Sequence, residues 1–336
     1  MITIFEDNTF EDFYPFTLNH ATFEIKEGQN TLLQSLTNNA VESSMVLIVR
    51  DSIESLVRER YPDALVNPSS IPNESEKIYL SKYFNKNNLF DFAGLPKEWD
   101  GVASFERQPS LDGDFITINQ NAIHISELAT VSKGAILDAS QGPIIIDDNA
   151  LIDIGALIKG PVYIGKSSII NPGAKLKNAN IGAYCKIGGE VEHTTFHGFS
   201  NKQHDGYLGH SYIGEWVNLG ANTNNSDLKN NYSDIRFNMG NKEVSIGMFG
   251  GCLIGDYTKT GISTMINTGT YMGLGCNVFG AGFQKKYISN FSWGMDDQKV
   301  DFDKFLQTLK IVKSRRDRVV TSAELEFIEN AYKNKI

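Results

Sequence analysis

Large aliphatic residues recur at every sixth position through the middle of the chain. The longest run comprises Ile146, Ile152, Ile158, Ile164, Ile170 and Leu176 and, after a slip of one residue, Ile181 and Ile187. A second run comprises Ile254, Thr260, Ile266, Met272 and Val278. A six-residue period is typical of a parallel β-helix, in which each unit is a short strand followed by a turn. Because the aliphatic side chains point inward and stack from coil to coil, they predict one continuous apolar column.

Glycine marks the extent of this region. Of the 30 glycines, 25 lie between residues 119 and 293, where tight turns between short strands favour a residue without a side chain. An antiparallel sheet would instead show a period of two and hairpin dipeptides. We therefore expect a mainly β protein in three segments: a small α/β domain over 1–118, the β-helix over 119–293 and a helical tail over 294–336.

The flanking segments carry shorter patterns. Apolar runs at 2–5 and 45–49 predict strands, and helical spacing at 31–36 and 53–61 predicts helices. In the tail, apolar residues from Phe302 to Val312 share one helical face, and a capping box from Thr321 to Glu324 predicts a last helix over 325–333. We expect the tail helices to pack against the β-helix or a neighbouring subunit.

Composition narrows the possible partners and the compartment. The chain carries 31 Lys and Arg residues against 40 Asp and Glu residues, a net charge of −9, so it lacks the positive footprint of proteins that bind nucleic acid or anionic membranes. No apolar run is long enough to span a bilayer, and Met1 is not followed by a basic signal region. We therefore expect a cytoplasmic protein with no nucleic-acid or membrane partner.

Three cysteines complete the compositional picture. They are Cys185, Cys252 and Cys276. An odd number without a CxxC pair predicts neither a disulfide framework nor a structural zinc site. We expect the three cysteines to lie in a core, where they act as small apolar residues.

The six-residue period is broken twice between residues 188 and 245, and the broken stretches, 201–210 and 218–232, are rich in polar residues. Insertions in a solenoid form surface loops, which commonly carry the binding site. Four of the six histidines lie in this region, at His193, His197, His204 and His210. One interpretation is a metal site, although no carboxylate or cysteine stands in convincing ligand spacing.

The other interpretation makes His204 a general base. Transfer of an acyl group from a thioester to an amine needs the ammonium group of the acceptor to lose a proton as it attacks. Histidine is suited to accept that proton at neutral pH. Tyr207 would position the substrate or the histidine. Asn218 and nearby backbone amides would donate to an oxygen on which charge develops.

The run from His204 to Thr223 resembles a known family. It is similar to the acetyltransferase domain of the bifunctional bacterial enzymes that acetylate glucosamine 1-phosphate and uridylylate it to UDP-N-acetylglucosamine, whose motif reads His-x-x-Tyr-x-Gly and then Ile-Gly-x-x-Val-Asn-Ile-Gly-Ala-Gly-Thr. The resemblance implies a left-handed parallel β-helix of the hexapeptide-repeat acyltransferases, acetyl-CoA as acyl donor and a homotrimer with active sites between subunits. It places the catalytic histidine on His204, the substrate-binding tyrosine and asparagine on Tyr207 and Asn218, and the alanine beside the thioester on Ala221. Asn222 replaces a family glycine.

The variant branch of this family, found in Bacteroidetes and some archaea, is still more similar. Its motifs Gly-Gly-Glu-Val, Ser-Asn-Lys-x-His-Asp-Gly, Asn-Asn-Ser-x-Leu-Lys-Asn-Asn-Tyr and Phe-Ser-Trp-Gly stand at 188–191, 200–206, 224–232 and 291–294. The branch opens with a nucleotidyltransferase-like domain whose start reads Leu-Pro-Leu-Thr-x-x-Arg-Pro-x-x-x-Ile-Arg-x-Gly. Residues 14–28 of this chain resemble that start, with His20 and Ala21 in place of the Arg-Pro pair.

Two departures bear on the substrate. Where the family binds a sugar phosphate with an arginine and a lysine, this chain has Asn171 and Glu192, and charge-assisted bonds are the strong ones. Lys202 and Lys229 are the candidates to replace them; otherwise the acceptor is another amino sugar or a nucleotide sugar. The first domain lacks a glycine-rich phosphate loop, since Gly94 is the next glycine after Gly28.

These features predict an acetyl-CoA-dependent N-acetyltransferase acting on an amino-sugar phosphate or nucleotide sugar, with a truncated first domain. Three alternatives stay open. The first domain retains sugar-1-phosphate nucleotidyltransferase activity; the protein is a non-catalytic sugar-nucleotide-binding scaffold; or it is a metal-dependent protein that uses His193, His197 and His204.

Overall fold

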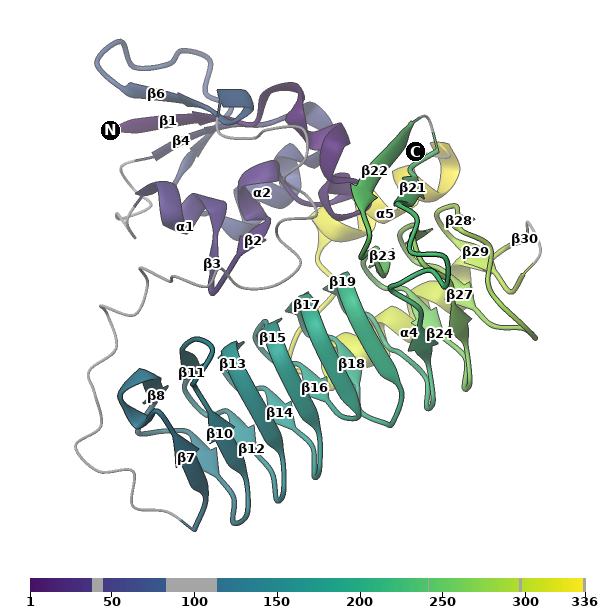
Figure 1. Ribbon diagram of the computed structural model, residues 1–336. Helices are drawn as coiled ribbons and strands as arrows, with labels where there is room; N and C mark the ends of the chain where they lie inside the picture. The colour runs from purple at the N-terminus through teal and green to yellow at the C-terminus, as the bar shows by residue number, and fades with distance from the viewer. Residues whose placement is uncertain (38–44, 83–113, 241, 296–297, 335–336) are drawn as a thin grey trace. The chain divides into compact units, whose positions relative to one another are not determined.

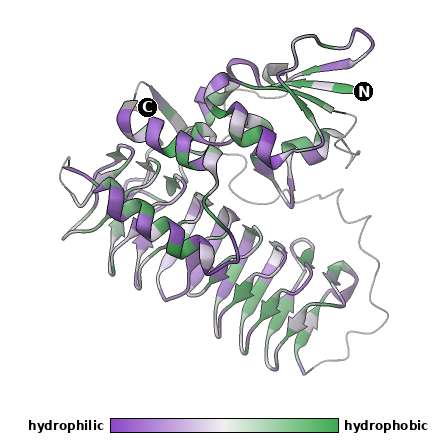
Figure 2. Cartoon of the chain, turned by 180° about the vertical axis from the view of Figure 1, so that it is seen from behind, coloured by the Kyte–Doolittle hydropathy of each residue, from purple (hydrophilic) through white to green (hydrophobic). Residues whose placement is uncertain are grey.

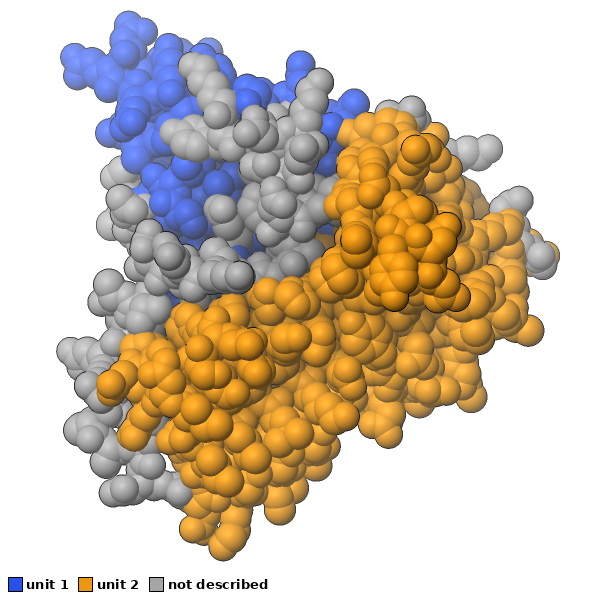
Figure 3. Space-filling model, in the orientation of Figure 1, with its two compact units in different colours: residues 1–89, 301–336 blue, residues 90–300 orange. Residues whose placement is uncertain are grey.

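The computed structural model describes residues 1–37, 45–82, 114–240, 242–295 and 298–334 (Figure 1). The chain divides into two compact units, one formed by residues 1–89 with 301–336 and the other by residues 90–300 (Figure 3). Among the described residues no helix combines the length and the apolar character needed to cross a bilayer.

The first unit contains a small parallel sheet with helices. Its strands, in the order β5-β4-β1-β6, are Leu65–Val66, Met45–Ile48, Ile2–Phe5 and Glu76–Tyr79. Helices α1 (Leu32–Thr37) and α2 (Glu54–Arg60) follow β1 and β4 along the chain, and β2 (Lys26–Glu27) pairs with β3 (Asn30–Thr31) in a short hairpin. The buried side chains of Ile4, Val46 and Leu47 line the sheet, as their apolar strand patterns predict.

Two C-terminal helices belong to this same unit. Helix α4 covers Phe302–Ser314, and α5 covers Ser322–Asn334 and contacts α2. The backbone N–H of Glu324 donates to Oγ1 of Thr321 at 3.1 Å, which is the cap that the sequence predicts. The sequence predicts both helices; their place in one unit with the N-terminal sheet is a finding of the structure.

The second unit is the predicted left-handed parallel β-helix. Its largest sheet contains β7 (Ile116–Ile118), β8 (Ile123–Ile125), β10 (Ile136–Asp138), β11 (Ile144–Ile146), β13 (Leu157–Ile164), β15 (Lys175–Ile181), β17 (Glu190–Gly198), β19 (Tyr207–Glu215), β23 (Cys252–Ile254), β26 (Thr270–Met272) and β28 (Tyr287–Ile288). A second sheet contains β9 (Thr130–Val131), β12 (Leu151–Ile152), β14 (Ile169–Ile170), β16 (Lys186–Ile187) and β18 (Asn201–Lys202). The last coils add β24 (Lys259–Thr260), β27 (Asn277–Val278), β29 (Ser292–Trp293) and β30 (Gln298–Lys299).

Inward-facing residues stack in register from coil to coil. Ile152 pairs with Ile170, and Ile170 pairs with Ile187; all three are fully buried. Apolar residues recur along these strands coil after coil (Figure 2). Cys185, Cys252 and Cys276 are buried in the same core. The aliphatic column that the six-residue period predicts is therefore the core of the β-helix.

An insertion interrupts the coils between β19 and β23. It contains β20 (Asn224–Asn225), which pairs with β25 (Met265–Ile266), and the antiparallel hairpin of β21 (Ile235–Asn238) and β22 (Glu243–Gly247). Beyond it Ile213 pairs with Ile254, so the parallel stacking resumes. The insertion places its own polar residues beside those of β17 and β19.

Candidate active site

The turn of residues 203–206 carries the predicted catalytic histidine at one corner of the β-helix. His204 is exposed. The next coil places Ala221 and Asn222 beside this turn, because the Asn222 backbone N–H donates to the Asp205 carbonyl oxygen at 3.0 Å. A Cβ at Gly206 would lie 2.2 Å from the Thr223 carbonyl oxygen, so glycine lets the two coils approach. His204 and Ala221 therefore lie on consecutive coils at one corner.

Three successive carbonyl groups of this turn accept hydrogen bonds. Nδ2 of Asn171 donates to the Gln203 carbonyl at 2.8 Å, and Nζ of Lys202 donates to the His204 carbonyl at 2.9 Å. The Asn222 backbone N–H donates to the third carbonyl, that of Asp205. Asn171 therefore supports the His204 turn. Pre-ordering of this kind fixes the backbone from which a catalytic side chain projects.

Lys202 occupies an inward-facing position of the core. It pairs with Ile187 in the column that begins with Ile152 and Ile170, and its side chain is 2% exposed. Its ammonium donates to the carbonyls of Gly188 and His204 at 3.0 and 2.9 Å. Burial lowers the pKa of Lys202 to about 8, although nearby Asp205 acts in the opposite direction. A sugar-phosphate contact by Lys202 stays a prediction; the observed ammonium holds the turn from inside.

Tyr207, the predicted substrate-binding tyrosine, belongs to a hydrogen-bond network that the sequence did not reveal. Its hydroxyl donates to Oδ2 of Asp227 at 2.7 Å, and Nδ1 of His210 lies 2.7 Å from the same oxygen. Burial acts to raise the pKa of Asp227, but the hydrogen bonds from His210 and Tyr207 outweigh it and hold that pKa below its usual value. Burial, reinforced by the Asp227 carboxylate, raises the pKa of Tyr207. At neutral pH the network therefore contains a carboxylate and a protonated phenol.

A ladder of side chains continues the network at the adjoining corner. The His210 ring stacks on His193, with centroids 4.5 Å apart, and on Phe249, with centroids 4.9 Å apart. Nδ2 of Asn178 lies 2.9 Å from Nδ1 of His193. Burial, followed by the charges of His210 and Lys177, lowers the pKa of His193 to about 4, so His193 is neutral at pH 7. The stack fixes the plane of the His210 ring.

The Asn-Asn-Ser-Asp segment of the insertion builds this network. Oδ1 of Asn224 accepts from the Tyr207 backbone N–H at 2.8 Å, and the Asn225 side chain bonds both the N–H and the carbonyl of Gly209. These bonds fix the strand that carries Tyr207 and His210. Asp227 follows two residues after Asn225, at the variable position of a motif that the sequence did contain. The motif could point to this segment, but it could not identify which residues its carboxylate contacts.

The remaining predicted residues lie around this region in different environments. Asn218 stands between Asn201 and Lys259 on neighbouring coils, and its Oδ1 lies 3.4 Å from Nδ2 of Asn201. Lys229 is half-buried, and its ammonium donates to the Asp234 carbonyl and lies 3.4 Å from Oγ of Ser233. Both residues remain candidates for substrate binding.

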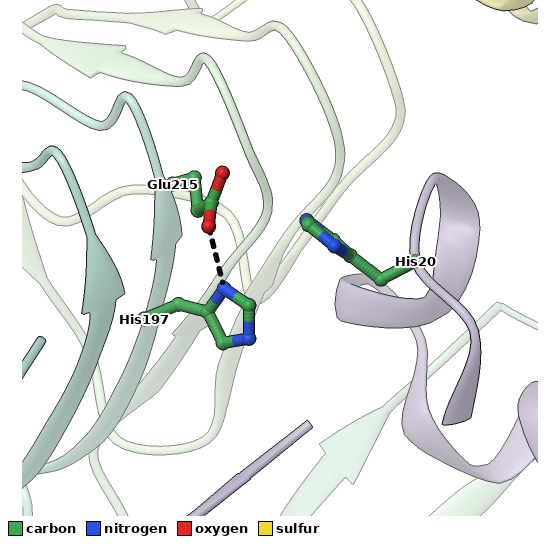
Figure 4. A group of neighbouring side chains, drawn as sticks. All are labelled: His20, His197 and Glu215. Carbon is green, nitrogen blue, oxygen red and sulfur yellow. Dashed lines mark hydrogen bonds and ion pairs between the residues drawn. The ribbon is translucent and has the colours of Figure 1, made fainter. Parts of the chain in front are cut away.

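The histidines named in the metal hypothesis fall into separate groups within the described part of the β-helix. His193 stacks on His210, and His204 projects from its turn. His197 instead lies 3.1 Å from Oε1 of Glu215 (Figure 4). A second His–carboxylate pair, of the same kind as His210–Asp227, thus exists elsewhere in this unit.

In the first unit, the segment that resembles a nucleotidyltransferase start makes contacts with the unit's own side chains. The Ala21 backbone N–H donates to Glu24 at 2.7 Å, and the Thr22 N–H donates to Glu6 at 3.0 Å. Arg50 forms an ion pair with Glu6, and Arg60 with Glu24. A phosphate loop needs backbone amides directed at its ligand, but these two amides are directed at carboxylates.

Comparisons with known proteins give distant relatives. No family model matches the chain. It is 24% identical over 217 residues to the bifunctional protein GlmU of Xylella fastidiosa, covering 54% of this chain and 45% of that one. It is 35% identical over 148 residues to a bifunctional sugar-1-phosphate nucleotidylyltransferase/acetyltransferase of Sulfurisphaera tokodaii, covering 41% of this chain and 36% of that one. The chain thus spans less than half the length of these curated relatives.

Solved structures give a weaker likeness. A point mutant of AntD, an N-acyltransferase from Bacillus cereus in complex with dTDP and coenzyme A, is 15% identical. The match covers 58% of this chain and 91% of that one, with a TM-score of 0.23. A score this low carries no structural argument. The similarity to the curated relatives, one of which is named a sugar-1-phosphate nucleotidylyltransferase/acetyltransferase, covers only part of this chain.

Proposed function

We propose that this chain is an acetyl-CoA-dependent N-acetyltransferase that acts on the amine of an amino-sugar phosphate or nucleotide sugar in the cytoplasm. One observation carries the proposal. The His204 imidazole is exposed on a turn whose three carbonyls are held, one coil away from Ala221. The names of the curated relatives, which include sugar-1-phosphate nucleotidylyltransferase/acetyltransferase, support the same class of reaction.

In the proposed reaction His204 accepts a proton from the ammonium group of the acceptor. The freed lone pair attacks the thioester carbonyl carbon, and the carbon–sulfur bond breaks as the tetrahedral intermediate collapses. The second proton of the attacking nitrogen neutralises the departing thiolate, and His204 returns its proton to solvent. Tyr207 and Asn218 orient the acceptor, while Ala221 borders the thioester.

In this proposal, lysines of the insertion and of the last coils bind the phosphate of the acceptor. Burial and the charge of Lys229 lower the pKa of Lys286, while the charge of Glu243 acts in the opposite direction. An anion bound beside the two lysines would relieve their repulsion. We therefore assign the phosphate of the acceptor to Lys229, with Lys286 as its neighbour.

The test is release of free coenzyme A thiol from acetyl-CoA with a panel of amino-sugar phosphates and nucleotide amino sugars. We expect turnover with at least one acceptor and a loss of two to four orders of magnitude in kcat for His204→Ala. His197→Gln serves as the control, because His197 pairs with Glu215 instead. A silent wild type, or a His204→Ala variant with full activity, would contradict the proposal.

The alternatives give different results in the same preparation. A retained nucleotidyltransferase would release pyrophosphate from a nucleoside triphosphate and a sugar 1-phosphate. A scaffold would bind a nucleotide sugar without turnover. A metal-dependent protein would lose activity on chelation. The proposed homotrimer is checked by sedimentation equilibrium, where the particle should weigh three times the 37.3 kDa of one chain.

A further inference from the structure

The hydroxyl group of Tyr207 already donates its proton to another side chain of the protein. A phenol has one proton to donate, and here it is donated to Oδ2 of Asp227 at 2.7 Å. Asp227 is held as a carboxylate by its second bond, from His210. The side chain of Asp227 is only 14% exposed, and that of His210 only 23%. The Tyr207 oxygen therefore offers lone pairs, and not a proton, to anything that binds beside it.

The surroundings of Tyr207 reinforce this polarity. Glu190 and Glu192 project from the preceding coil near enough for their charges to act on the phenol. Glu192 lies 3.7 Å from Lys177, and Glu190 lies 3.6 Å from Lys175, so each has a lysine on the coil before it. A phosphate brought to Tyr207 would meet two carboxylates and a hydroxyl group whose proton is already donated to Asp227. A hydroxyl or ammonium group would meet acceptors.

We propose that Asp227 is a positioning residue that makes Tyr207 a hydrogen-bond acceptor, so that the site binds the acceptor sugar by a hydroxyl donor at this point and excludes its phosphate from it. The inference rests on the proposed acetyl transfer and adds to it the residue that sets the orientation of the sugar. Asp227 acts through Tyr207, and His210 acts by holding Asp227 in its charged form. Polar groups built to accept from a substrate discriminate strongly against an analogue that lacks the donor.

The test is a double-mutant cycle on Tyr207→Phe and Asp227→Ala, measured with the acceptor that the wild type turns over. Each single variant should raise the acceptor KM and lower kcat/KM about tenfold, the size of one hydrogen bond to substrate. Because Asp227 acts through the Tyr207 hydroxyl, the double variant should lose no more than Tyr207→Phe alone. Losses that multiply would show that Asp227 works independently and would overturn the inference.

Two further variants separate positioning from stability. Asp227→Asn keeps an oxygen that can accept the Tyr207 proton, so it should recover most of the kcat/KM lost in Asp227→Ala; an Asn variant as impaired as the Ala variant would count against the proposal. Glu215→Ala removes the carboxylate of the matched His197 pair and should leave the acceptor KM unchanged.

Acceptor analogues test the same point without any change at Asp227, which keeps the inference testable if Asp227→Ala does not fold. In a series of acceptors that each lack one hydroxyl, one analogue should lose about tenfold in kcat/KM with the wild type and nothing further with Tyr207→Phe. An equal loss with both enzymes for every analogue would overturn the inference while leaving acetyl transfer intact. A wild type without turnover on any acceptor would instead remove the proposed function, and the inference with it.

Discussion

At the scale of single residues, Lys202 stands where the preceding coils place isoleucine. Its ammonium is removed from water, and its hydrogen-bond partners among the described residues are two carbonyl groups. A pKa of about 8 in the folded protein against 10.5 in the unfolded chain corresponds to a destabilisation of about 3 kcal/mol. That cost is present in full below pH 8, where both states are protonated. It disappears between pH 8 and 10.5, where the unfolded chain holds more protons and stability rises with pH.

Lys202→Met should therefore be more stable than the wild type at pH 7, by up to about 3 kcal/mol, because methionine fills the column without a buried charge. The advantage should shrink as the pH rises from about 8 to 10.5. The same variant should lose acetyl transfer, since the His204 carbonyl loses its donor. Urea unfolding at pH 7 and pH 10, with thiol release measured in parallel, checks both effects. A variant less stable at pH 7 would mean that the two carbonyl bonds outweigh the cost of burial.

Gly209 makes room for the Tyr207 network. A Cβ at this position would lie 2.2 Å from the Tyr207 hydroxyl oxygen and 2.4 Å from Oδ2 of Asp227. Gly209→Ala should push these groups apart and raise the acceptor KM about tenfold, with a loss of about 1–3 kcal/mol in stability from overpacking. Gly198→Ala is the control, because the nearest atom to its Cβ would be 3.4 Å away. Steady-state kinetics on both variants decide the matter; equal KM values would argue against a constrained network.

At the scale of secondary-structure elements, two-residue strands such as β12, β14 and β16 each have one buried side chain that faces the core and a neighbour that is only half-buried. In β14, Ile170 is fully buried and its neighbour Ile169 is not. Ile170→Ala should lower the free energy of unfolding by about 2–5 kcal/mol through lost burial and a cavity. Ile169→Ala, the same chemical change one residue away, should cost less than half as much. Denaturant unfolding of both variants measures the contrast, and similar losses would mean that the column is not the main source of stability.

The elements that follow the six-residue period could be predicted from the sequence, but only some residues of the candidate site could. Ile152, Ile170 and Ile187 stack in the column that their spacing predicts. The period fails after Ile187, where the next partner, Lys202, comes early, so spacing could not show that this lysine faces inward. The sequence motif does identify His204 as a candidate catalytic residue and Tyr207 as a candidate substrate-binding residue. The contact between Tyr207 and Asp227 spans an insertion whose path no period determines.

At the scale of the whole molecule, the two compact units have different relations to the proposed chemistry. The β-helix carries His204, Tyr207 and Asp227, while the first unit carries the segment that resembles a nucleotidyltransferase start. In that segment the amides of Ala21 and Thr22 already donate to carboxylates. A triphosphate would have to displace those carboxylates, and like charges within a few ångströms of its phosphates would oppose it.

We therefore expect acetyl transfer without nucleotidyl transfer. Incubated with UTP, or another nucleoside triphosphate, and N-acetylglucosamine 1-phosphate, the wild type should release no pyrophosphate above the rate without enzyme, in the same preparation that releases coenzyme A thiol with its acceptor. A bifunctional relative assayed beside it establishes that the conditions support the reaction. Pyrophosphate release by this chain would show that the carboxylates of Glu6 and Glu24 move aside when a nucleotide binds. In that case variants of Glu24, which accepts from the Ala21 amide, should change the KM for the nucleotide while leaving acetyl transfer unaffected.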